Sequence, residues 1–273
     1  MQNQKSNLYI VGTVHIDPDG PKRLDSLLTS LSPQTILLES HEDSLPYLKK
    51  SKAPEHSKEE IYQAFRDIGI GLNERQVQTY LKVIKKLTRT MGFELYRPQE
   101  YARKNPRTEL VCMDMPVIQS EEDCKALNTT LLKRNLEALR NLEVRDLFLS
   151  KLDKGPNAYL ALLRESVASF YSLDFLEQLE EMQKLRQTAQ DLMQDQETEE
   201  DSDYTPEERA LAKRIIDPKR NNKMESTIRS VYLADPSKTT LAICGMDHFL
   251  VLRRKLKRLK PNIKTLEEIS AST

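Results

Sequence analysis

The sequence lacks an excess of either charge. Lys and Arg number 42, Asp and Glu also number 42, and the formal net charge is +0. This balance, together with an aromatic content of only 6%, argues against nucleic acid and against an anionic membrane surface as partners. No apolar run approaches the ~20 residues that cross a bilayer, and the N-terminal stretch MQNQKSNLYIVG has no long apolar region typical of a signal peptide. We therefore expect a protein without a membrane span.

Cysteine and glycine are also scarce. The 3 cysteines are too few for a disulfide framework, and Cys112 and Cys244 lie in apolar strand-like runs where buried thiols are common. This usage predicts a reducing, cytoplasmic location. With only 7 glycines in the chain, those at positions 12, 20 and 245 are expected to have structural roles.

Strand-like segments cluster near the two ends of the chain. The first two, 7–14 and 34–40, flank a segment with helical spacing over 21–31, which Pro21 opens. A strand, a helix and a second strand in this order predict a βαβ unit with parallel strands. Further strands are expected over 108–114 and 239–245, with a short final strand in 262–269. We predict an α/β fold with a mixed or mostly parallel sheet.

The remaining sequence is mostly helix-forming. Ser57 and Glu60 have the spacing of a capping box, and helices are expected over 73–91, most of 119–193, 218–233 and roughly 247–260. The acidic stretch 194–208 has no apolar period and is expected to be a mobile loop. We predict one domain over 1–273, with a core from 1–43, 92–118 and 217–273 and helical insertions over 44–91 and 119–216.

Polar side chains follow the predicted strands where each strand ends. The pattern Gly-x-x-His occurs at 12–15 and again at 245–248, each time after an apolar run. Glycine permits close approach and a positive φ in the turn that aims the histidine. Ligands bind outside the carboxyl ends of parallel strands, and imidazoles with carboxylates suit a divalent transition metal that activates water. The candidate ligands are His15, His248, Glu39 and Asp114. A strand-ending glycine beside an incidental histidine is the alternative.

The two Gly-x-x-His motifs, with ILLES after the first, resemble the TraB/PrgY–TIKI–GumN superfamily, which is related in fold to ChaN and erythromycin-esterase-like proteins. The segment GFELYRPQEYARKN followed by ELVCMDMP is similar to the family's helix before a strand that ends in Asp. The segment KRNNKMESTI resembles its Arg-Asn/Asp-x-x-Met element. Order and spacing agree over roughly 1–43, 92–118 and 217–255.

This resemblance implies a metal-dependent hydrolase, with the peptidase activity ascribed to TIKI-type members and with manganese or cobalt rather than zinc. It matches Glu39 to the family glutamate, a ligand or general base, and Arg220 and Asn221 to a polar pair near the site. It matches the remaining ligands by position: His15, His248 and Asp114. The stretch LLESHED departs from the family pattern because it has His41 and no nearby Arg, which leaves substrate recognition open.

A second class of function stays open at this point. The same fold could serve a non-catalytic protein that carries a metal or haem, or that sequesters a peptide as a regulatory module. The substrate is therefore a peptide or another small molecule, or there is none, and an oligomer remains possible.

Several other residues have two interpretations. His41 is either an extra metal ligand or a loop histidine. Asp17 and Asp19 either orient His15 or form a turn. Asp247 either belongs to the site or caps the following helix. His56 is expected to be exposed before a helix. The basic run 252–260 is a nucleic-acid surface or, as we expect, a solvated helix face. The aromatic residues Phe170, Tyr171 and Phe175 pack the insertion or cover the site.

Overall fold

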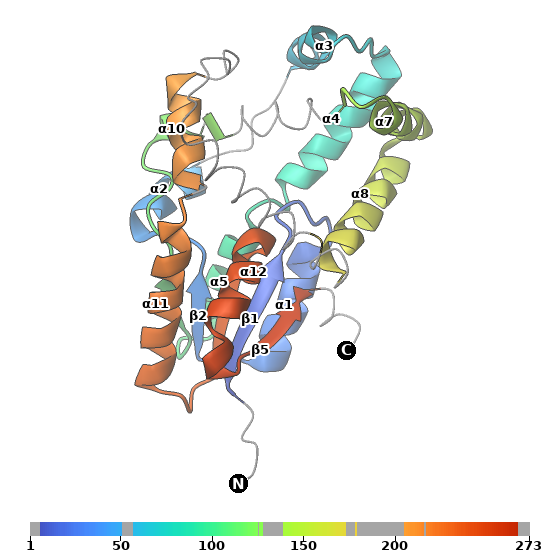
Figure 1. Ribbon diagram of the computed structural model, residues 1–273. Coiled ribbons are helices and arrows are strands. Elements are labelled where there is room, and N and C mark those ends of the chain that lie inside the picture. The colour runs from blue at the N-terminus through green and yellow to red at the C-terminus, as the bar shows by residue number, and fades with distance from the viewer. Residues whose placement is uncertain are drawn as a thin grey trace.

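The computed structural model describes residues 6–50, 57–124, 126–127, 139–172, 178, 205–215 and 217–266. Its centre is a five-stranded sheet in the order β3-β2-β4-β1-β5, in which every neighbouring pair is parallel (Figure 1). The predicted α/β class is confirmed, and the sheet is fully parallel over the described strands. The strands are β1 (Leu8–Thr13), β2 (Thr35–Leu38), β3 (Glu109–Cys112), β4 (Thr240–Gly245) and β5 (Asn262–Thr265).

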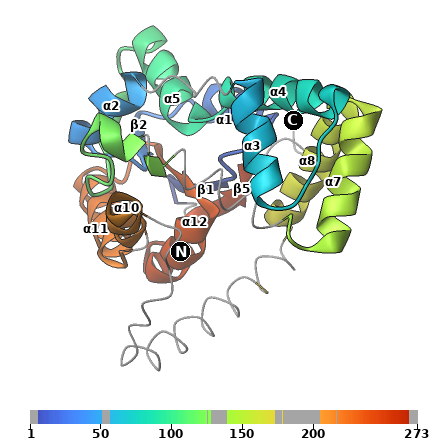
Figure 2. The same cartoon turned by 90° about the horizontal axis from the view of Figure 1, so that it is seen from above.

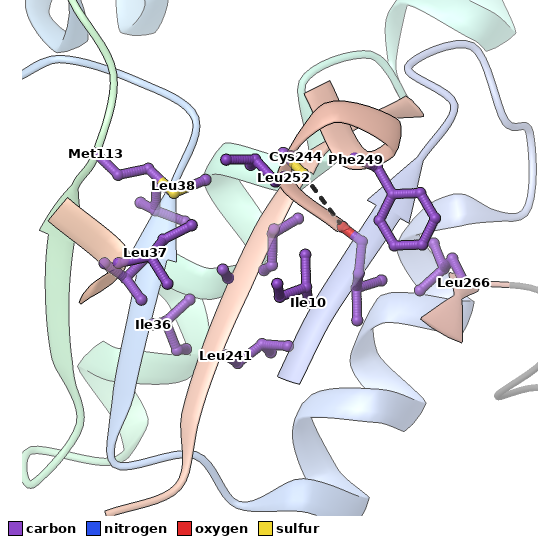
Figure 3. Close-up of a cluster of buried hydrophobic side chains, with 14 of the residues drawn as sticks. Ile10, Ile36, Leu37, Leu38, Met113, Leu241, Cys244, Phe249, Leu252 and Leu266 are labelled. Carbon is purple, nitrogen blue, oxygen red and sulfur yellow. Dashed lines mark hydrogen bonds between the residues drawn. The ribbon is translucent and has the colours of Figure 1, made fainter. Parts of the chain in front are cut away.

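Burial decreases from the central strands to the edges of the sheet. Every residue of β2 and β4 is buried, whereas no residue of the edge strand β3 is fully buried. Helices cover both faces, so the inner strands are apolar on both sides and appear in the sequence as the continuous runs TILL and TLAIC. The core contains Ile10, Leu37, Leu241, Phe249 and Leu252 (Figure 3).

Two pairs of helices form the outer layers. The helices α1 (Gly20–Leu31) and α5 (Phe93–Lys104) pack against each other on one face, and α11 (Lys219–Ala234) and α12 (Met246–Lys255) cover the other face (Figures 1 and 2). Pro21 lies in the first turn of α1, as expected, and Ser32 ends the helix in a left-handed conformation with φ 45°. The predicted helix over 247–260 ends earlier, at Lys255, before the 3₁₀ turn Lys257–Leu259.

Four helices form what we call the helical insertion. They are α3 (Lys58–Asp67), α4 (Glu74–Thr88), α7 (Leu142–Lys154) and α8 (Pro156–Tyr171). The capping box of Ser57 and Glu60 is present at the start of α3, as predicted. These helices have an apolar cluster of their own, in which the Phe65 and Phe148 rings stack at a centroid distance of 5.7 Å.

The remaining described elements are short. They are the 3₁₀ turn Glu42–Ser44, α2 (Leu45–Lys50) and α10 (Pro206–Ile215). Of the predicted acidic loop 194–208, residues 194–204 lie outside the described residues. The prediction of a loop is wrong from Pro206 onward, because α10 begins there. His56 and Phe175 also lie outside the described residues. Among the helices that are described, none is long and apolar enough to cross a bilayer.

Candidate functional site

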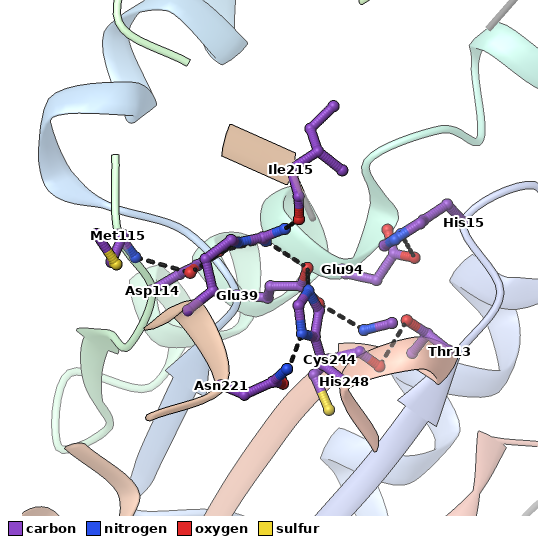
Figure 4. Close-up of polar contacts among 12 residues, drawn as sticks. Thr13, His15, Glu39, Glu94, Asp114, Met115, Ile215, Asn221, Cys244 and His248 are labelled. Atoms are coloured by element: carbon purple, nitrogen blue, oxygen red, sulfur yellow. Dashed lines mark hydrogen bonds and ion pairs between the residues drawn. The ribbon is translucent and has the colours of Figure 1, made fainter. Parts of the chain in front are cut away.

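The carboxyl ends of the strands meet at one edge of the sheet. In the register of β1 and β4, Thr13 lies opposite Gly245, so the two Gly-x-x-His motifs leave the sheet side by side. Glu39 and Asp114 follow the ends of the neighbouring strands β2 and β3. Figure 4 shows all four predicted strand-end side chains at this edge.

Glu39 has the most polar contacts of this group. Its Oε2 accepts a hydrogen bond of 2.6 Å from the Gly245 N–H, at the N-terminus of α12. Its Oε1 accepts a 3.0 Å hydrogen bond from Arg220 Nη2 and lies 3.3 Å from His248 Nε2. Backbone N–H groups at a helix N-terminus attract a carboxylate, so these elements position Glu39 as a fixed anion.

The surroundings of Glu39 change its pKa. Burial raises the pKa of this carboxyl, but the hydrogen bond and charge of His248 and the charges of His15 and Arg220 outweigh burial and lower it to about 2. A carboxylate with this pKa is a weak proton acceptor at neutral pH. Of the two roles that the resemblance implies for Glu39, these contacts favour the ligand over the general base.

Both histidines are held at Nδ1. His15 Nδ1 lies 2.8 Å from Glu94 Oε1, and His248 Nδ1 lies 2.9 Å from Asn221 Oδ1 (Figure 4). A carboxylate and an amide oxygen are acceptors, so each Nδ1 donates its proton and each Nε2 is left for another partner. Metal-binding histidines are commonly fixed in this way.

His248 then faces Glu39 with an unusual pairing. A neutral imidazole that donates from Nδ1 has only a lone pair at Nε2, and this lone pair points at a carboxylate oxygen 3.3 Å away. The pairing is satisfied either by a proton on Nε2 that is donated to Glu39 or by a cation bound to both atoms. Two ligands bonded to one ion at about 2.1 Å lie roughly 3 Å apart, which the observed distance matches.

Gly245 lets two of these side chains lie close against the backbone. A Cβ atom at this position would lie 2.8 Å from His15 Nε2 and 3.5 Å from Glu39 Oε2, so both atoms border the same point. At position 12 glycine allows a different close contact, because a Cβ there would lie 2.5 Å from Met246 Sδ in α12. Neither glycine has a positive φ, so close approach, and not a left-handed turn, explains both.

Asp114 is at the predicted edge but has another partner. Its two oxygens each accept from Arg220 Nε at 3.1 Å, and its Oδ1 also accepts from the Met115 N–H at 2.7 Å. Arg220 also donates from Nη1 to the Ile215 carbonyl at 2.6 Å. Burial lowers the pKa of Arg220, but the hydrogen bonds and charges of Asp114 and Glu39 outweigh burial, so the pKa is raised overall. The contacts therefore join Asp114 to Arg220 and not to the imidazoles.

The other candidates have structural roles. His41 Nδ1 accepts from the Asp43 N–H at 3.3 Å, as expected of a loop histidine. Asp17 Oδ1 accepts a hydrogen bond of 2.9 Å from the Asp19 N–H, as expected if these two residues form a turn. The cap of α12 is Gly245 and not Asp247, whose charge acts instead on His15. The cations of 252–260 are mostly exposed.

Glu94 is the site residue that the sequence did not single out. It lies in the first turn of α5, and the charge and hydrogen bond of its carboxylate raise the pKa of His15 to about 9 against the opposing effect of desolvation. The imidazole of His15 remains 59% exposed. Glu94 lies inside the segment 92–105 that carries the family resemblance, but nothing local distinguishes it from other helix-start glutamates.

A metal needs several donor side chains close together. Within the described ranges, no group of three or more His, Cys, Asp or Glu side chains stands ready to hold an ion. The donor chemistry of His15, His248 and Glu39 fits one nevertheless, because two imidazoles and one carboxylate are a common ligand set for divalent transition metals. The bound Nδ1 atoms and the approach of His15 Nε2 and Glu39 Oε2 to Gly245 agree with this.

The fold and the site together define an α/β protein with a candidate metal centre at the carboxyl edge of a parallel sheet. Among models of protein families no match to the chain is found, and curated proteins give no match either. The resemblance carried by the Gly-x-x-His motifs thus stays a prediction.

Proposed function

We propose that this chain is a metal-dependent hydrolase acting on peptides, in which His15, His248 and Glu39 hold the metal. The observation that supports the proposal best is the pair of imidazoles whose Nδ1 atoms are bound by Glu94 and Asn221. His248 Nε2 lies 3.3 Å from Glu39 Oε1, and His15 Nε2 and Glu39 Oε2 both lie beside Gly245. The peptide substrate and the preference for manganese or cobalt rest on the family resemblance alone.

A bound divalent metal would supply Lewis acidity and a water of lowered pKa at such a site. The chain's own residues prepare for this. Glu39 keeps its negative charge because its pKa is about 2, and Asn221 and Glu94 hold the Nδ1 atoms of the two imidazoles. Arg220 fixes the Glu39 carboxylate, and we assign Asp114 to holding Arg220.

A peptide-library cleavage assay tests this function. We expect the wild-type chain loaded with manganese or cobalt to cleave a subset of peptides, and His248→Ala to cleave none. His41→Ala is the matched control, because it removes a loop histidine with the same substitution. Cleavage that survives in His248→Ala, or is equally lost in His41→Ala, would contradict the proposal.

A non-catalytic binding protein is the second candidate. The observation in its favour is that the carboxylates at this edge already contact cations: Glu39 and Asp114 contact Arg220, and Glu94 contacts His15. Such a network can stabilise the sheet edge while the chain binds a metal, haem or a peptide without cleaving it. Stoichiometric binding without cleavage in the same assay would favour this candidate.

We also propose a cytoplasmic location. The three cysteines are all free, with Cys124 and Cys244 buried and Cys112 partly buried. Free thiols are typical of reducing compartments.

A further inference from the structure

The helical insertion reaches the loop of the first Gly-x-x-His motif through a buried tyrosine. Tyr171, the last residue of α8, is only 3% exposed and packs in the core of the sheet, not in the apolar cluster of the insertion. Its hydroxyl accepts a hydrogen bond of 3.1 Å from the Val14 N–H and donates one of 3.3 Å to Asp17 Oδ2.

These two hydrogen bonds lie on either side of His15 in the sequence. Asp17 is 1% exposed and also accepts a 3.2 Å hydrogen bond from Arg23 Nη1, so the acceptor is itself fixed. Burial and the nearby Asp17 charge raise the pKa of Tyr171, which therefore keeps its proton and can donate. The hydroxyl thus bridges the two ends of the loop segment that presents the imidazole.

A second contact joins the same helix to the same loop. Arg164 Nε donates to Asp19 Oδ2 at 2.7 Å, but both side chains are partly exposed, so solvent weakens this pair. The buried Tyr171 contact is therefore the stronger attachment of α8 to the loop.

His15 needs such support because its ring has little packing. Its side chain is 59% exposed, and its only side-chain hydrogen bond among the described residues is the one that Nδ1 donates to Glu94 on α5. The backbone of the loop must then place the ring so that Nε2 lies against Gly245.

We propose that Tyr171 is a positioning residue for His15, through which the helical insertion sets the affinity of the strand-end site for a divalent metal. The inference rests on the proposed metal site. It gives the insertion a role in the site although no helix of it supplies a ligand.

Cobalt titration of Tyr171→Phe tests the proposal. This substitution removes the hydroxyl and keeps the ring, and we expect the cobalt dissociation constant to rise by roughly 10- to 100-fold, as for other groups that orient a ligand. Tyr159→Phe is the matched control, since this tyrosine is on the same helix but packs on Phe148 in the other cluster. We expect wild-type affinity and an unchanged cobalt absorption spectrum for the control.

A metal-free measurement separates failure of this inference from failure of the proposed function. In NMR spectra of the apo protein, Tyr171→Phe should shift or broaden the His15 ring signals and speed hydrogen exchange at the Val14 amide, whereas Tyr159→Phe should change neither. If wild type binds no cobalt, the metal function is wrong, and an unchanged His15 signal would separately contradict positioning by Tyr171.

The outcome that overturns the inference is equal cobalt affinity in Tyr171→Phe and wild type together with unchanged His15 signals. If Tyr171→Phe does not fold, Asp17→Asn serves in its place, because it weakens the acceptor of the same hydroxyl while keeping its shape. Asp17→Asn should then change the cobalt affinity and the His15 signals in the same direction, and no change would contradict the proposal.

Discussion

The carboxyl edge of the sheet and the centre of the helical insertion bury side chains of opposite kinds. At the sheet edge, Arg220 and Asp114 are both less than 10% exposed and pair with each other. In the insertion, the buried residues that are described are apolar or aromatic except for the uncharged Gln76 and Thr79, and an ion pair such as Lys58 with Glu74 stays at the surface. Buried ion pairs repay their desolvation poorly, so the sheet edge keeps charges where they contribute least to stability. This difference points to the sheet edge as the place of chemistry and to the insertion as its support.

The largest expected effect is at Arg220. Arg220→Met would leave Asp114 and Glu39 buried without their common cation, which costs about 3–5 kcal/mol of unfolding free energy. Urea unfolding measures this loss. Arg229→Met on the same helix α11 is the control, because its pair with Glu225 is partly exposed and should cost about 1 kcal/mol or less. Equal losses for both variants would remove the distinction between buried and exposed charges.

A core truncation in the insertion should affect stability without affecting the site. Leu152 is 0% exposed in the apolar cluster of α7, and Leu152→Ala should cost about 2–4 kcal/mol by loss of buried area and a cavity. We expect the folded Leu152→Ala protein to bind metal with wild-type affinity, which cobalt titration measures. Loss of metal binding in the folded Leu152→Ala protein would show that the site depends on the apolar cluster of the insertion and not on Tyr171 alone.

A third expected effect is in the pH dependence of stability. The pKa of Glu39 is lowered from 4.5 to about 2 in the folded chain, so its contribution is complete above pH 4.5 and is lost as pH falls toward 2. The slope from one carboxyl is at most about 1.4 kcal/mol per pH unit. Glu39→Gln should flatten the acid side of the stability curve measured by urea unfolding. An unchanged acid side would contradict the charged environment described for Glu39.

The stability contribution of His15 depends on pH with the opposite sign. Its pKa is raised from 6.5 to about 9, so any stability from its pair with Glu94 is complete below pH 6.5 and lost as pH rises through 9. The imidazole is largely exposed, and solvent screening keeps this contribution small.

Local sequence patterns were sufficient for the sheet. Apolar runs bounded by turn residues correctly predicted all five described strands, and the capping box at Ser57 correctly marked the start of α3. The strand-end rule also located His15, Glu39 and His248 at one edge, because parallel strands align their carboxyl ends whatever the residues between them.

The partners of these residues could not be predicted in the same way. Arg220 pairs with Asp114 across 106 positions, and Tyr171 with Val14 across 157. Such pairs depend on how helices pack on the sheet, which leaves no periodic signal in the chain. For the same reason Asp114 was expected beside the imidazoles: its place at a strand end was readable, but the arginine opposite it was not.

The most direct test of the central claim is the metal content of the purified chain. Wild type and the double variant His15→Ala/His248→Ala would be loaded with manganese, cobalt or zinc, freed of excess metal and measured by elemental analysis, with unfolding curves showing that both are folded. The account predicts close to one manganese or cobalt ion per wild-type chain and none in the folded double variant. Equal metal content in both, or none in either, would contradict the proposed metal site.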